Sequence, residues 1–128
     1  MSIRENARLV AIVDDDESLN NALRDLIESD GLSALSFDSA EQFLHSEARH
    51  KAACLIADIR MPGMSGLELH AKLKAESCRI PVIFITAHGD DEMRSAALRD
   101  GAVEFLTKPF DDDVLLEMVH AALEKVER

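Results

Sequence analysis

The chain has 128 residues, 47% of them hydrophobic and 30% charged, with a net charge of −11 at pH 7. This length suits one soluble domain with its own core. No apolar run approaches the ~20 residues of a membrane span, and residues 1–8 lack the apolar stretch of a secretory signal, so we expect a cytoplasmic chain that contacts no membrane. The negative charge argues against nucleic-acid binding by this chain, because phosphate backbones repel it. Cys54 and Cys78 have the spacing of neither a metal knuckle nor a disulfide framework, which predicts plain thiols.

Five short apolar runs alternate with helical patterns along the chain. The runs are residues 9–13, 32–37, 53–57, 80–86 and 102–107, and Ser33 and Ser36 interrupt the second. The uninterrupted run 9–13 is typical of a strand covered on both faces. The helical patterns cover 17–30, 39 to about 48, 65 onward, 91–100 and about 114–126. Five strand–helix units with short connections predict one α/β domain with a parallel sheet.

Several residues mark where the predicted helices begin and end. Gly31 is a natural stop for the first helix, and Ser39 with Gln42 and Ser65 with Glu68 form two capping boxes. The last helix is expected to pack inward through Val114, Leu115, Met118, Val119, Ala122 and Val126.

Reactive side chains follow four of the predicted strands. Asp14 and Asp15 come after the first, Asp58 after the third, Thr86 after the fourth and Lys108 after the fifth. Because the carboxyl ends of parallel strands share one edge of a sheet, these side chains should lie close together. Three carboxylates, a hydroxyl and an ammonium at one edge could hold a divalent cation and a phosphoryl group.

Each of these residues also has an ordinary structural interpretation. Acidic residues suit a helix start, which is our preferred interpretation of Asp16 and Glu17. Asp58 could be a turn residue, Thr86 the last β-branched residue of its strand, and Lys108 a surface lysine.

Three observations favour a functional site over those interpretations. Asp14 and Asp15 directly end a buried strand, where adjacent carboxylates repel unless a cation such as Mg²⁺ lies between them. A turn at Pro62 and Gly63 holds the chain close to the preceding strand end. A cis bond before Pro109 would aim the Lys108 ammonium over the sheet edge.

Four motifs occur together: Val13-Asp14-Asp15, DIRMPGMSG at 58–66, Ile85-Thr86-Ala87 and FLTKPF at 105–110. In combination they closely resemble the receiver domain of bacterial two-component response regulators. The resemblance covers about residues 7–126 and makes 1–128 a single receiver domain without an output domain. It implies a flavodoxin-like (βα)₅ three-layer sandwich whose five parallel strands have the order 2-1-3-4-5.

The resemblance also implies the roles of the phosphorylation site. Asp58 is the phosphoacceptor, and Asp14 and Asp15 bind Mg²⁺ together with a carboxylate oxygen of Asp58 and the backbone carbonyl of Arg60. Lys108 binds the phosphoryl group, which a sensor histidine kinase or a small acyl phosphate supplies. Such a domain is not an enzyme in the usual sense, because it catalyses only its own phosphoryl transfer and dephosphorylation.

The same resemblance implies a conformational switch. Thr86 is its hydroxyl and Phe105 its aromatic ring, which is often Tyr and here lacks the hydroxyl. On phosphorylation, space would open behind Thr86 and Phe105 would turn inward, which shifts a pre-existing equilibrium. Arg60 and His88 flank the site, either as simple lining or as residues that tune dephosphorylation.

The signal would leave through the face formed by helix 91–100, strand 102–107 and the last helix. That face carries charges of both signs on Arg94, Arg99, Asp100, Glu104, Asp111, Asp112 and Asp113. They suggest a salt-bridged homodimer formed on phosphorylation, with a merely solvated surface as the equal alternative. Residues 86–90 and 60–66 most resemble receivers attached to a LuxR-type helix-turn-helix domain, so transcription is the expected output. The chain is then an excised part of a transcription regulator or a stand-alone receiver.

Two other functions share part of this pattern. A Mg²⁺-dependent phosphohydrolase of the haloacid dehalogenase type would need a second acid two residues after its nucleophile, where this chain has Arg60. A degenerate receiver that acts as an interaction module would lack part of the acceptor, acid pair, Thr and Lys set.

Overall fold

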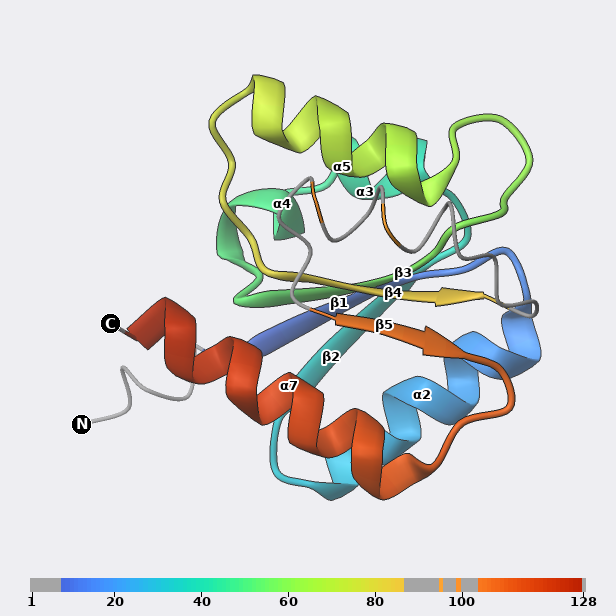
Figure 1. The fold of residues 1–128 in the computed structure, drawn as a ribbon, viewed down its shortest axis with the longest axis vertical. Helices are drawn as coiled ribbons and strands as arrows, with labels where there is room; N and C mark the ends of the chain where they lie inside the picture. Colours follow the sequence, from blue (N-terminus) through green and yellow to red (C-terminus); the bar gives the residue numbers. More distant parts are fainter. Residues whose placement is uncertain (1–7, 87–94, 96–98, 100–103, 128) are drawn as a thin grey trace.

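The computed structural model describes residues 8–86, 95, 99 and 104–127. In Figure 1 a five-stranded sheet lies between two layers of helices. Its strands are β1 (Leu9–Val13), β2 (Ser33–Phe37), β3 (Cys54–Asp58), β4 (Val82–Thr86) and β5 (Glu104–Thr107). All neighbouring strands pair in parallel, in the order β2-β1-β3-β4-β5, which confirms the predicted three-layer fold.

The described helices divide between the two faces of the sheet (Figure 1). On one face lie α2 (Glu17–Ser29) and α7 (Asp112–Glu127), and on the other α3 (Ala40–Leu44), α4 (Ala48–Lys51) and α5 (Gly66–Ala75). Among the described helices, none combines the length and the apolar character that crossing a bilayer requires.

The central strands are buried on both faces, which explains why their sequences are apolar without interruption. Residues Val10 to Val13 of β1 are all 0% exposed. Alternate side chains enter two separate cores. One contains Phe43, Leu69 and Phe84 under α3 and α5, and the other contains Leu23 and Ile27 of α2 with Leu115 of α7. Each such large side chain contributes about 2 kcal/mol through burial.

Capping interactions fix where the helices begin. The Asp16 carboxylate accepts the Leu19 N–H at 3.2 Å and begins α2, as predicted. Ser65 and Glu68 form the expected capping box of α5. The other predicted box is half formed: Ser39 accepts the Gln42 N–H, but the Gln42 side chain accepts from Asp38 instead of Ser39.

The second predicted helix is divided in two, so its expected extent to about residue 48 is wrong. Helix α3 ends at Leu44, and the Ser46 N–H closes a tight turn by donating to the Phe43 carbonyl at 3.1 Å. The Ser46 hydroxyl then accepts the Ala48 N–H at 2.9 Å, at the start of α4. Because this serine bonds to the backbone on both sides, it ends one helix and begins the next.

The inward face of α7 differs from the expected one at Val114, which is 38% exposed. Leu115, Val119 and Ala122 are buried as predicted, and Leu123 joins them. Counted from Leu115, the other three lie four, seven and eight positions further along the helix, so the four residues form one stripe that Val114 lies beside. The predicted helix 91–100, apart from 95 and 99, lies outside the described residues, as do residues 102 and 103 and the Val126 side chain.

Both cysteines are free thiols, as expected. Cys54 lies in β3 and is 0% exposed, and burial raises the pKa of its thiol to about 12. A thiol with such a pKa is a poor nucleophile at neutral pH, so Cys54 serves as a small core residue.

Candidate functional site

The strand register brings the predicted site residues to one edge of the sheet. Asp58, the last residue of β3, pairs with Ile85 of β4, and Thr86 pairs with Thr107 of β5. Lys108 follows Thr107 directly, and its N–H donates to the Thr86 carbonyl at 2.6 Å. The carboxyl ends of these strands therefore present their side chains side by side, as the sequence predicted.

Asp14 is a fully buried carboxylate at the end of β1. It is 0% exposed, and its Oδ1 accepts the Asp16 N–H at 2.8 Å while its Oδ2 accepts from the Lys108 ammonium at 3.3 Å. Burial, which disfavours the charged form, raises the pKa of Asp14 from 3.8 to about 6, and the nearby Asp58 charge adds to this rise. An ionised Asp14 thus needs a positive charge beside it at neutral pH.

Lys108 supplies positive charge to two carboxylates at once. Its Nζ lies 3.1 Å from Asp58 Oδ2 and 3.3 Å from Asp14 Oδ2, and its side chain is 22% exposed. Burial lowers the lysine pKa, but the hydrogen bond to Asp58 and the charges of both acids outweigh it, so the net pKa is raised. The Lys108–Pro109 peptide bond is cis. Lys108 is therefore a bound cation of the site and not a surface lysine.

Asp58 is held from two sides. Its Oδ1 accepts the Arg60 N–H at 3.0 Å and its Oδ2 accepts from Lys108, while its side chain remains 9% exposed. The start of α5 packs directly on its backbone, because a Cβ at Gly66 would lie only 2.3 Å from the Asp58 carbonyl oxygen. The carboxylate is thus fixed in direction and still reachable from solvent.

Three carboxylates meet where the sequence predicted a cation site. One oxygen each of Asp14, Asp15 and Asp58 lies within 4.8 Å of the others. Asp14 and Asp58 are buried, and Asp15 is exposed. Clustered carboxylate oxygens with a solvent-facing side suit Mg²⁺, which takes hard oxygen ligands and keeps several waters. The donor set therefore fits magnesium.

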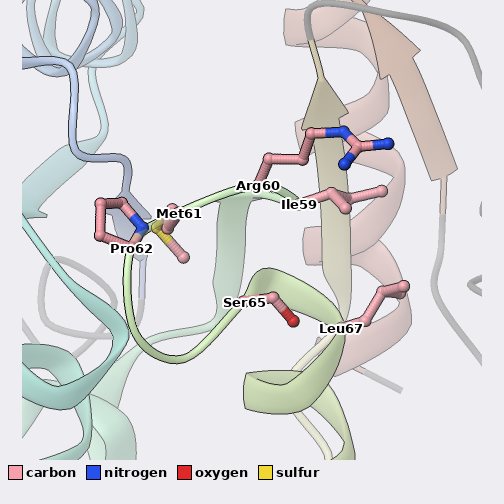
Figure 2. Close-up of a pocket in the computed structure, with 6 residues that line it drawn as sticks. All are labelled: Ile59, Arg60, Met61, Pro62, Ser65 and Leu67. Carbon is pink, nitrogen blue, oxygen red and sulfur yellow. The ribbon is translucent and has the colours of Figure 1, made fainter.

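A hollow of about 440 Å³ opens along the loop that follows Asp58. Figure 2 shows the residues that line it: Ile59, Arg60, Met61, Pro62, Ser65 and Leu67. Arg60 extends away from Pro62, and both are exposed (Figure 2). Glu41 of α3 stabilises this loop, because its carboxylate accepts the Met64 N–H at 3.3 Å. The loop that follows Asp58 is thus held in place by α3.

Thr86 and Phe105 are both buried, 2% and 4% exposed. Phe105 of β5 pairs across the sheet with Phe84 and belongs to the core under α3 and α5. The ring therefore already occupies an inward position in this structure. His88, and Arg94 and Asp100 of the expected output face, lie outside the described residues.

One polar residue beside the site was not predicted. Asn20 of α2 is 2% exposed, and its amide donates to the Asp14 carbonyl at 2.6 Å. Its only signal in the sequence is that an amide occupies a position of the helix that lies in line with Leu23 and Ile27.

Known proteins are similar to this chain. Residues 10–120 match the response regulator receiver domain family. The response regulator protein TodT of Pseudomonas putida is 45% identical over 119 residues, which cover 93% of this chain and 52% of TodT. The transcriptional regulatory protein FixJ of Bradyrhizobium diazoefficiens is 36% identical over 118 residues, 92% of this chain and 58% of FixJ.

Solved structures agree with this assignment. The response regulator StyR superposes with a TM-score of 0.86 and 43% identity over 94% of this chain and 62% of StyR, and FixJ-N with a TM-score of 0.82 and 39% identity over 91% and 94%. The chain spans about half the length of the curated relatives it matches. Family match, relatives and fold together show that the chain belongs to the response regulator receiver domain family.

Proposed function

We propose that Asp58 is the phosphoacceptor of this receiver domain and that Asp14 and Asp15, with Asp58 and the Arg60 carbonyl, bind the Mg²⁺ that the reaction needs. The observation that carries the proposal is the Lys108 ammonium within hydrogen-bond distance of both Asp14 and Asp58. Such a cation, next to a buried acid and a solvent-reachable one, suits a site that receives a phosphoryl dianion.

The chemistry is an in-line phosphoryl transfer. A carboxylate oxygen of Asp58 attacks the phosphorus of a phosphohistidine, the P–N bond breaks, and its electron pair remains on the imidazole of the kinase. Lys108 offsets negative charge on the phosphoryl oxygens, and the Arg60 N–H holds the acceptor carboxylate in place. Mg²⁺, when bound, supplies further charge neutralisation at the phosphoryl oxygens.

The phosphorylated state would be read through Thr86 and Phe105. A phosphoryl group on Asp58 adds charged oxygens that the Thr86 hydroxyl can reach by hydrogen bonding, one β-strand away. Phe105 is already inward, so we infer that phosphorylation stabilises an arrangement near this one instead of creating it.

The partners follow from the same proposal. A sensor histidine kinase donates the phosphoryl group in the cytoplasm, and the output is transcription, as the name of the FixJ relative suggests. A LuxR-type DNA-binding domain would carry that output, as the resemblance of residues 60–66 and 86–90 implies. Homodimerisation through residues 91–100, β5 and α7 would transmit the signal. The described residues retain the full acceptor, acid pair, Thr and Lys set, which supports a phosphorylated receiver over a degenerate interaction module.

Intact mass spectrometry with acetyl phosphate and Mg²⁺ tests this proposal. The wild-type chain should gain one phosphoryl mass, which EDTA prevents. Asp58→Asn should gain none, whereas Asp38→Asn, the same substitution at an exposed acid, should be labelled like wild type. Labelling of the Asp58→Asn chain at the wild-type rate would refute the assignment.

A further inference from the structure

Asn20 is a buried polar residue in an otherwise apolar helix face. It lies in line with Leu23 and Ile27 of α2, which pack in the core between this helix and the sheet. Asn20 is 2% exposed, as Leu23 is. Burying an amide is unfavourable unless it is hydrogen-bonded, so packing alone favours an apolar residue at this position.

The Asn20 amide connects the carboxyl ends of two strands. Its Nδ2 donates to the Asp14 carbonyl at 2.6 Å and to the Phe37 carbonyl at 3.1 Å. Both partners can only accept, so the nitrogen must face them. Phe37 also accepts the Asp14 N–H at 3.2 Å. Asn20 thus closes a small network just beyond the last paired residues of β1 and β2, Val13 and Phe37.

The oxygen atom of the Asn20 amide is not stabilised at this position. The Asn20 Oδ1 is buried and has no hydrogen-bond partner among the described residues. An unpaired buried acceptor costs free energy, which offsets part of the stabilisation from the two Nδ2 hydrogen bonds. Those bonds still satisfy the Asp14 carbonyl, so the stability of the fold accounts for Asn at position 20 only in part.

The same hydrogen bonds also fix the position of Asp14. With this bond, both backbone polar groups of Asp14 and both of its carboxylate oxygens are bonded. The direction of the Asp14 side chain is thus set before any ligand arrives. A carboxylate whose backbone is fixed loses less conformational freedom when it binds a cation.

We propose that Asn20 is a positioning residue for the cation site: it fixes the Asp14 backbone so that the Asp14 carboxylate is preorganised to bind Mg²⁺. This inference rests on the proposed function of Asp14 as a Mg²⁺ ligand. Residues that orient metal ligands typically change metal affinity by 10- to 100-fold when they are replaced.

The test measures Mg²⁺ binding by calorimetry on the full 128-residue chain. Asn20→Leu should raise the Mg²⁺ dissociation constant about tenfold. The urea midpoint measured in EDTA should fall as well, because the variant leaves the Asp14 carbonyl without its donor. A merely structural role would lower the midpoint in the same way but leave the Mg²⁺ affinity of the folded chain unchanged. Asn21→Leu is the matched control, because Asn21 is the adjacent asparagine and is exposed, and both properties should remain at wild-type values.

Two further comparisons keep the result decisive. If Asn20→Leu does not fold, Asn20→Ala removes the same hydrogen bonds without adding bulk, and it should show the same loss of Mg²⁺ affinity. A wild-type chain that neither binds Mg²⁺ nor is labelled at Asp58 contradicts the proposed function itself. A wild-type chain that does both, beside an Asn20 variant with unchanged Mg²⁺ affinity, overturns the positioning role alone.

Discussion

The two edges of the sheet both carry a cluster of charged side chains, but the clusters differ in burial. At the carboxyl edge, Lys108 contacts Asp14 and Asp58, whose side chains are 0% and 9% exposed. At the amino edge, Glu76 contacts Arg49 and Lys72, and the Glu76 and Lys72 side chains are 38% and 48% exposed. The first cluster has two acids for one base, and the second has two bases for one acid.

This difference in burial distinguishes the candidate functional site at the carboxyl edge from an ordinary network of surface ion pairs at the amino edge. The hydrogen bond with Arg49, and then that with Lys72, lowers the pKa of Glu76, so this acid is ionised at no cost to the fold. Burial instead raises the pKa of Asp14 to about 6, so its charged form is held at a cost that only a cation can offset. Perturbed acids of this kind concentrate at functional sites, whereas exposed ion pairs are common and worth little.

The largest effect is expected at Gly66, where the carboxyl edge is packed most tightly. Gly66→Ala would place a methyl group 2.3 Å from the Asp58 carbonyl and 3.0 Å from Ile59 Cα, so backbone must move. We expect a loss of about 3 kcal/mol in the free energy of unfolding, although Ala normally favours a helix over Gly. Urea unfolding followed by circular dichroism measures it, since the chain has no Trp or Tyr.

Gly31→Ala is the control for this substitution. Gly31 has a φ of +87°, and a Cβ there would meet nothing within 4 Å. It should therefore cost only about 1 kcal/mol, the penalty for the left-handed backbone. If both substitutions lowered the free energy of unfolding equally, the close approach of Gly66 to Asp58 would not be the cause of the loss.

A smaller, pH-dependent effect is expected at Asp14. Its folded pKa of about 6 exceeds the ordinary 3.8, so the folded state holds an extra proton between these pH values. The metal-free domain should therefore lose stability as pH rises from about 4 to 6, and Asp14→Asn removes this loss. Relative to wild type, the variant should gain about 2 kcal/mol between pH 4 and pH 7.5 in EDTA. Unfolding midpoints across this range measure the gain.

Asp15→Asn removes one charge from the same loop at an exposed position. If it produced the same pH-dependent gain as Asp14→Asn, burial would not be the cause. Adding Mg²⁺ at pH 7.5 should make wild type more stable than Asp14→Asn, the reverse of the order expected in EDTA, because only wild type keeps the full ligand set.

The sequence predicted most of this molecule because strong local patterns coincide with its elements. Short apolar runs located the strands, although Ser33 and Ser36 interrupt the second one. Parallel order then placed Asp14, Asp58 and Lys108 at one edge. The break after Leu44 was missed, because it depends on how the Ser46 hydroxyl bonds and not on periodicity. Asn20 was missed for a similar reason: its partners are carbonyls of Asp14 and Phe37, which only the folded chain brings together.

The smallest effect is expected at the amino edge, with Glu76→Gln. Glu76 is exposed, so its contacts with Arg49 and Lys72 are weakened by solvent and by salt. Any loss of stability should be smaller than the loss expected for Gly66→Ala, and smaller in size than the gain expected for Asp14→Asn. It should disappear when the urea titration is repeated at about 1 M NaCl, where charges are screened within about 3 Å. A loss that persists in high salt would mean that Arg49, whose side chain is 16% exposed, depends on Glu76 as a buried cation depends on its partner. Burial would then no longer distinguish the two edges, and they would differ only in which charged residues each one contains.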